Sequence, residues 1–114
     1  MAVTVRSARD WALALPGASE RPHFHLTAFR TPRKTFATLD AVGERINLMF
    51  DPDLRDFYSE QAPAAFAPLP GGWGRMGCTM CDLKTVDAAT LRSALQAAHA
   101  LAAPRPGRRR AAAT

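Results

Sequence analysis

Long hydrophobic runs and cysteine are scarce in this 114-residue sequence, and lysine occurs only twice. No run of about 18 apolar residues is present, so we expect no transmembrane helix and no membrane association. The opening segment, MAVTVRSARDW, carries charges where a secretory signal peptide needs an apolar core, so we expect no export. Two cysteines without a secretory context favour a reducing, cytoplasmic setting.

Acidic residues are missing from the last ten positions, where four arginines lie. The full chain has 15 basic and 10 acidic side chains, so residues 1–104 keep 11 basic and all 10 acidic ones. The positive charge therefore belongs to the C-terminal segment, and the rest is nearly neutral. We predict one domain over residues 1–104 and a disordered basic tail over residues 105–114.

Hydrophobic periodicity predicts helices over residues 4–15, 51–61 and 87–104. Three short apolar segments between residues 22 and 50, separated by turns, predict an antiparallel three-stranded meander. Residues 19–21 are predicted as a loop, residues 62–72 as an extended linker and residues 73–83 as the last strand. The sequence thus predicts an α+β fold in which N- and C-terminal helices pack an antiparallel sheet.

Alternation along the strands predicts which side chains share a face. We expect Phe24, Leu26 and Ala28 to share one face of the first strand of the meander. Ile46 and the alternate residues that follow it line up in the same way on the third strand. The helices are expected to cover the resulting aromatic and aliphatic layer.

The densest basic cluster of the domain falls at one predicted turn, Thr31-Pro32-Arg33-Lys34. With Arg30 just before it, this turn places three cations at a hairpin tip that could contact phosphates. A solvated loop with ordinary surface charges is the more common outcome for such a cluster.

Cys78 and Cys81 form a single CxxC pair, whereas a zinc ribbon needs two such pairs. In a strand, residues three apart point to opposite faces and lie roughly 10 Å apart, too far for a disulfide. We therefore interpret both as buried free cysteines and predict no metal ligand set. A site that joins one cysteine with His23, His25 or His99 stays open as a minor alternative, because a sequence does not report distances between strands.

Several motifs resemble the MmcQ/YjbR family: PGASE after the first helix, HFHLTAFR, KTFATL, PGGWGRMG and the VDAATLRSAL helix. The similarity extends over residues 5–104. It implies a CyaY-like (frataxin-like) fold that has been compared with a double-wing DNA-binding domain, and members are often labelled DNA-binding. The family supplies no catalytic residues. Its related sequences tend to have tryptophan at the positions of Cys78 and His99 and an aliphatic residue at Cys81, which implies a repacked core or a pocket.

Three functions follow as hypotheses. The first is a DNA-binding module that contacts its partner through Arg30, Arg33, Lys34 and Arg75. The second is a small-ligand or protein-interaction domain with a pocket around Trp11, Trp73, Cys78 and His99. The third is a Cys/His metal protein. We expect no cofactor and no enzymatic activity, because the sequence offers no set of nucleophile, base and orienting group.

Overall fold

The structure, a computed structural model, describes residues 3–103. Its helices are α1 (Val5–Leu13), α2 (Pro52–Gln61), α3 (Gly71–Arg75) and α4 (Ala88–Ala102). Its strands are β1 (Ser19–His23), β2 (Leu26–Arg30), β3 (Thr35–Asp40), β4 (Arg45–Leu48), β5 (Phe66–Pro68) and β6 (Thr79–Asp82). The six strands form one antiparallel sheet in the order β1-β2-β3-β4-β6-β5, which confirms the predicted fold class and the central meander of β2, β3 and β4.

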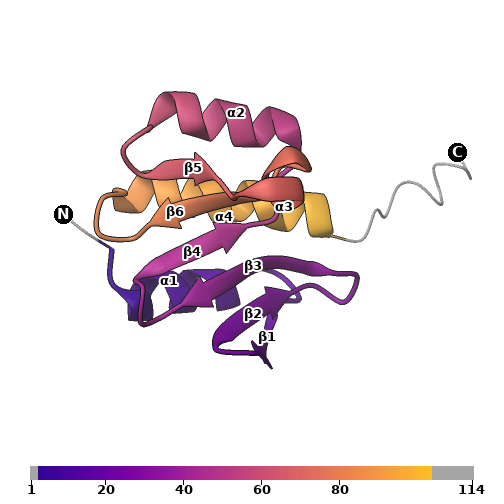
Figure 1. Ribbon diagram of the computed structural model, residues 1–114. Helices are drawn as coiled ribbons and strands as arrows, with labels where there is room; N and C mark the ends of the chain where they lie inside the picture. The colour runs from indigo at the N-terminus through magenta and orange to yellow at the C-terminus, as the bar shows by residue number, and fades with distance from the viewer. Residues whose placement is uncertain (1–2, 104–114) are drawn as a thin grey trace, which may run out of the picture.

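The two terminal helices, α1 and α4, lie on the same side of the sheet (Figure 1). α4 packs on β3 and β4, and α1 packs against α4. The helix α2 lies at one edge, against β5. The opposite side of β2, β3 and β4 has no helix of the described chain lying across it, and α3 stands at its rim (Figure 1).

The hydrophobic core fills the space between the sheet and the two terminal helices. Its largest fully buried side chains are Phe29, Phe36, Ile46, Leu48, Leu83, Leu91 and Leu95. Burying one such side chain stabilises the fold by about 1.5–3 kcal/mol relative to leaving it in water. The core is therefore built on one face of the sheet only.

Capping residues fix where three of the helices begin. Thr4, Asp51 and Asp87 precede α1, α2 and α4, and each side chain accepts a hydrogen bond from the backbone N–H three residues further on, at 2.7–3.0 Å. These bonds satisfy backbone donors that a helix leaves unpaired in its first turn. The starts of the three predicted helices are confirmed.

Residues 19–21 form part of β1 and not the predicted loop. β1 pairs with β2, with His23 opposite Leu26. Its residues are all exposed, as expected of an edge strand. The charged and proline-containing segment SERPH lacks the apolar alternation that marks a half-buried strand, which is why periodicity missed it.

The predicted face of Phe24 is wrong. Phe24 lies in the turn between β1 and β2 with a φ of 58°, and its side chain is 91% exposed. On β2 it is Phe29 that enters the core, whereas Leu26 and Ala28 point to the opposite side. Alternation identifies the two sets of side chains but does not say which set the helices cover.

The segment predicted as a linker and a final strand contains β5, α3 and β6. Trp73 therefore belongs to a short helix and not to a strand. The close approach of this helix depends on Gly74, where an added Cβ would lie 1.8 Å from the carbonyl oxygen of Leu69. Such a backbone contact is set by tertiary packing, which the Pro- and Gly-rich sequence does not reveal.

Residues 1, 2 and 104–114 lie outside the described residues, so the predicted basic tail over 105–114 falls there too. Among the helices described, none has the length and apolar character needed to cross a membrane.

Candidate ligand-binding site

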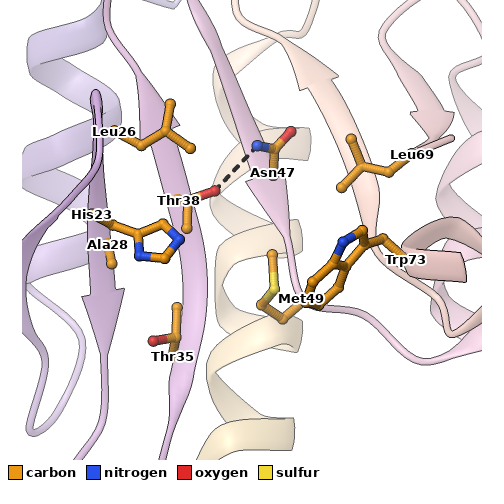
Figure 2. Close-up of a pocket in the computed structure, with 9 residues that line it drawn as sticks. All are labelled: His23, Leu26, Ala28, Thr35, Thr38, Asn47, Met49, Leu69 and Trp73. Carbon is orange, nitrogen blue, oxygen red and sulfur yellow. Dashed lines mark hydrogen bonds between the residues drawn. The ribbon is translucent and has the colours of Figure 1, made fainter. Parts of the chain in front are cut away.

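The side of the sheet turned away from α1 and α4 is hollowed (Figure 2). We call it the uncovered face, and β2, β3 and the end of β4 turn to it the residues Leu26, Ala28, Thr35, Thr38, Asn47 and Met49. The hollow has a volume of about 410 Å³ and a mostly apolar lining. This volume falls within the range of roughly 300–1,000 Å³ that is usual for small-molecule sites.

One polar pair interrupts the apolar floor of the hollow. Thr38 and Asn47 are directly opposite each other on β3 and β4, so their side chains share a face. Asn47 Nδ2 donates a hydrogen bond to Thr38 Oγ1 at 3.1 Å. An amide has a second N–H and a carbonyl oxygen, so Asn47 keeps both a donor and an acceptor for a further partner.

Two rings stand on opposite sides of the hollow (Figure 2). β1 supplies His23, whose position opposite Leu26 brings it to the uncovered face. α3 supplies Trp73, which lies beside Met49 and is 65% exposed. A large aromatic side chain this exposed at the rim of an apolar hollow can stack on a ligand at little conformational cost.

Two cations lie where the hollow ends at Thr35. Arg30 is directly opposite Thr35 because a bulge between Phe29 and Arg30 shifts the register of β2 on β3, and Lys34 precedes Thr35 in the chain. Arg30 Nε donates to the carbonyl oxygen of Thr31 at 3.2 Å. We call Arg30 and Lys34 the basic end of the hollow.

The thiol of Cys78 contacts the floor of the hollow at Met49. Cys78 Sγ lies 3.8 Å from Met49 Sδ. Burial raises the pKa of the Cys78 thiol, and the nearby ammonium of Lys34 opposes that shift by favouring the thiolate. Burial is the larger of these two effects, so the protonated thiol of Cys78 is favoured.

The opposite end of the uncovered face is electrically balanced. Asp40 Oδ2 lies 3.4 Å from Arg45 Nε, and its other oxygen accepts a hydrogen bond from the Gly43 N–H at 2.9 Å. These contacts hold the pKa of Asp40 below its ordinary value, with the Gly43 hydrogen bond as the largest cause. Asp82, which is opposite Arg45 on β6, pairs with Lys84 at 3.6 Å.

The four cations predicted to bind nucleic acid do not form one surface. Arg33 turns to the C-terminal end of α4, where its Nε donates to the carbonyl oxygens of Ala102 and Ala103, and its Nη2 donates to that of Leu101. Arg75 is two residues after Trp73 on α3, so the two side chains project about 200° apart around the helix. Arg30 and Lys34 are next to Thr35, which lines the hollow: Arg30 is opposite it on β2, and Lys34 precedes it in the chain.

The residues predicted to form a ligand pocket are also divided between the two sides of the sheet. Trp73 lines the hollow and Cys78 contacts its floor through Met49. Trp11 belongs to the helical layer, where the guanidinium of Arg92 lies 5.2 Å from its ring centroid. His99 is on α4; its Nε2 lies 2.7 Å from the carbonyl oxygen of Pro16.

The cysteines and histidines are likewise dispersed. Cys81 is fully buried in the core opposite Ile46, and burial raises the pKa of its thiol to about 12. Residues 3–103 contain no group of three or more His, Cys, Asp or Glu side chains that could hold a metal ion. The two cysteines of the CxxC pair therefore lie on different sides of the sheet: Cys81 is in the core, and Cys78 is beside Met49 of the uncovered face.

Sequence reasoning missed most of the residues that line the hollow. Thr38, Asn47 and Met49 look like ordinary strand positions, and no motif marks them. Asn47 is the one detectable signal, because an amide between Ile46 and Leu48 in a short apolar strand has to find a polar partner. Recognising the site requires the strand pairing that places Asn47 beside Thr38.

Comparisons with known proteins agree with this architecture. The model of the YjbR family matches residues 13–101, which confirms the resemblance predicted from the sequence motifs. One similar fold is that of a Deinococcus radiodurans protein whose crystal structure contains the domain DUF419. Its TM-score is 0.70 and its identity 22%, and the match covers 84% of this chain and 75% of that one. The crystal structure of a Pseudomonas syringae protein is similar with a TM-score of 0.61 and 14% identity, covering 82% and 94%. At these identities the likeness concerns the fold alone. No curated protein matches the chain.

Proposed function

The chain belongs to the YjbR family, and on that premise we propose that it is a small-ligand-binding domain whose site is the hollow of the uncovered face. One observation carries the proposal: a mostly apolar hollow of about 410 Å³ on a sheet face across which no described helix lies. An apolar surface of this kind, with a few polar groups converging on it, is typical of a binding site.

The lining favours binding over catalysis. His23 is the single titratable side chain among the residues that line the hollow. Thr35 and Thr38 supply hydroxyls, but no described hydrogen bond joins either hydroxyl to a histidine or a carboxylate. A nucleophile with its base and an orienting group is what covalent chemistry would need.

The two tryptophans give a direct test, because Trp73 lies at the hollow and Trp11 lies in the helical layer. Trp11→Phe leaves Trp73 as the single tryptophan, and Trp73→Phe leaves Trp11. We expect a screen of small metabolites to find compounds that quench the emission of the Trp11→Phe protein and leave that of the Trp73→Phe protein unchanged. Equal quenching in both proteins, or no response to any compound, would contradict the proposal. Thermal unfolding of both variants checks that each is folded.

A second candidate, DNA binding, is favoured by a different observation. Within residues 3–103, Arg30 and Lys34 take part in no ion pair. They lie near the end of α4, because Thr31 Oγ1 donates to the carbonyl oxygen of Ala102 at 2.7 Å. The arginines of residues 105–114 follow in the sequence. Unpaired cations beside the end of α4 could contact phosphates without reading the bases.

Mobility shifts with duplex DNA test this candidate. If the domain itself contacts phosphates, Arg30→Gln with Lys34→Gln should weaken binding and reduce the slope of log affinity against log salt by about 2. Arg33→Gln is the matched control, because its guanidinium is already bonded to α4. Loss of all affinity on removal of residues 105–114 would assign the binding to the tail and end this candidate for the domain.

A further inference from the structure

The charges on the uncovered face are unevenly distributed. Its acidic side chains, Asp40 and Asp82, are at one end, and each is already paired with a cation. The basic end carries Arg30 and Lys34, neither of which has an ion-pair partner among the described residues. Arg21 adds a third such cation on β1, opposite Ala28 of the floor.

The donors of the basic end are available to a ligand. Arg30 uses its Nε for the carbonyl oxygen of Thr31, and its two Nη groups have no hydrogen-bond partner among residues 3–103. The Lys34 ammonium likewise donates to no described side chain. A guanidinium and an ammonium on residues that both adjoin Thr35 can hold a carboxylate or a phosphate with charge-assisted hydrogen bonds.

Trp73 lies at the same end of the hollow. Met49 N–H donates to the carbonyl oxygen of Phe36 at 3.0 Å, which sets Met49 beside the start of β3, and the ring of Trp73 is next to Met49 (Figure 2). Arg30 is on β2, and Met49 directly follows β4. The distance between β2 and β4 across the sheet is two strand spacings, about 10 Å. A molecule that reaches both the indole beside Met49 and the basic end must therefore span at least about 10 Å.

We propose that the hollow selects an aromatic molecule that carries an anionic group, with its ring stacked on Trp73 and its anionic group held by Arg30 and Lys34. This inference rests on the ligand-binding function proposed above and names the class of its ligand. The free donor and acceptor of Asn47 would then contact a polar edge of the ring. An apolar molecule without charge would leave the two cations with solvent alone, and a small anion without a ring would leave the floor empty.

Two fluorescent probes separate the ring from the charge. Anilinonaphthalene sulfonate is an aromatic anion, and Nile red is a neutral aromatic molecule. We expect both to bind the native protein, and we expect Trp73→Ala to weaken both. Arg30→Gln with Lys34→Gln should weaken the anionic probe about tenfold at low salt and leave Nile red within about twofold.

A matched control removes the same two kinds of charge elsewhere. Arg6→Gln with Lys84→Gln deletes one arginine and one lysine. Arg6 is on α1, and Lys84 lies beside Asp82, at the end of the sheet away from the basic end. It should leave the affinity for both probes unchanged. Rising salt should weaken the anionic probe on the native protein and on this control, and should affect the Arg30 and Lys34 variant much less.

The outcomes distinguish the two proposals. If the Arg30 and Lys34 variant lost both probes equally or neither, the anionic part of the ligand would be wrong while the hollow could still be a binding site. If Trp73→Ala changed the affinity of neither probe, or if neither probe bound the native protein, the ligand-binding function itself would be wrong. Thermal unfolding of each variant excludes probe binding to an unfolded fraction.

The anionic group can be a carboxylate or a phosphate, and competition against anilinonaphthalene sulfonate decides between them. Displacement by naphthoate but not by adenosine monophosphate assigns an aromatic carboxylate. Displacement by the nucleotide, with adenosine as the uncharged control, assigns an aromatic phosphate. Displacement by adenosine as effective as by its monophosphate would overturn the role given to Arg30 and Lys34.

Discussion

The same three strands, β2, β3 and β4, present two faces of opposite character. Phe29, Ile46 and Leu48 point to the helices and are fully buried. Leu26, three residues before Phe29, and Asn47, between Ile46 and Leu48, point to the other side and stay partly exposed. Because strand side chains alternate, each strand serves two surfaces with separate residues. The covered face stabilises the fold, and the uncovered face is free to bind.

The two faces also differ in polarity. The covered face is closed by aliphatic and aromatic side chains, in which any added polar atom would need a partner. The uncovered face places the Thr38–Asn47 hydrogen bond at its centre and cations without a described ion pair at one end. Substitutions on the first face should therefore change the free energy of unfolding, and substitutions on the second should change affinity.

The largest expected effect compares two residues of β2. Phe29→Ala should lower the free energy of unfolding by about 3–5 kcal/mol, because it opens a cavity in a fully buried core. Leu26→Ala, three residues earlier on the uncovered face, should cost less than about 1 kcal/mol. Urea denaturation measures both. Similar losses for the two variants would mean that the uncovered face also belongs to the packed core.

A smaller effect is expected where α3 meets the rest of the molecule. Gly74→Ala would place a Cβ against the carbonyl oxygen of Leu69, so we expect a loss of about 1–3 kcal/mol and a displacement of Trp73 that weakens probe binding. Gly72→Ala in the same helix is the control, since the nearest atom to its added Cβ is Arg75 Nη2 at 3.6 Å. Full affinity in a folded Gly74→Ala protein would show that the position of Trp73 does not matter.

Arg33 and Lys34, neighbours in one turn, should have different effects: the first on stability and the second on probe affinity. Arg33→Gln removes the hydrogen bonds and the positive charge at the C-terminal end of α4, so we expect a loss of about 1 kcal/mol with unchanged probe affinity. Lys34→Gln should leave stability within about 0.5 kcal/mol and should weaken the anionic probe. Chemical denaturation and fluorescence titration measure the two quantities. Reversed results would place Arg33, and not Lys34, at the site.

How far the sequence predicts this molecule depends on the range of the interactions involved. Capping residues such as Asp51 and Asp87 act on N–H groups three residues away, so local sequence was enough to locate α2 and α4. The meander follows from alternation and turn residues in the same way. These parts of the fold are encoded within short windows of the chain.

The site is not encoded in such windows. The hollow requires β4 to pair with both β3 and β6, and it requires α3 to come close to Leu69. Arg33 and Lys34 are adjacent in sequence, yet Arg33 bonds to the end of α4, whereas Lys34 forms no ion pair among the described residues and precedes Thr35 of the hollow. Neither composition nor spacing predicts this difference between Arg33 and Lys34. The hydrogen bonds of Arg33 are made with residues about 70 positions away in the chain.

The smallest expected effect concerns the end of the uncovered face opposite the basic end. The Gly43 N–H and then Arg45 lower the pKa of Asp40 in the folded protein. A lowered carboxyl pKa contributes stability above the unfolded-state value of about 3.9, and that contribution is lost as the pH falls through the folded-state pKa. Asp40→Asn keeps an acceptor for Gly43 without the charge. We therefore expect the native protein to exceed this variant in free energy of unfolding at pH 6 and the difference to shrink as the pH falls below about 4. Urea denaturation over this pH range measures it, and a difference independent of pH would mean that Asp40 stabilises the turn by its shape alone.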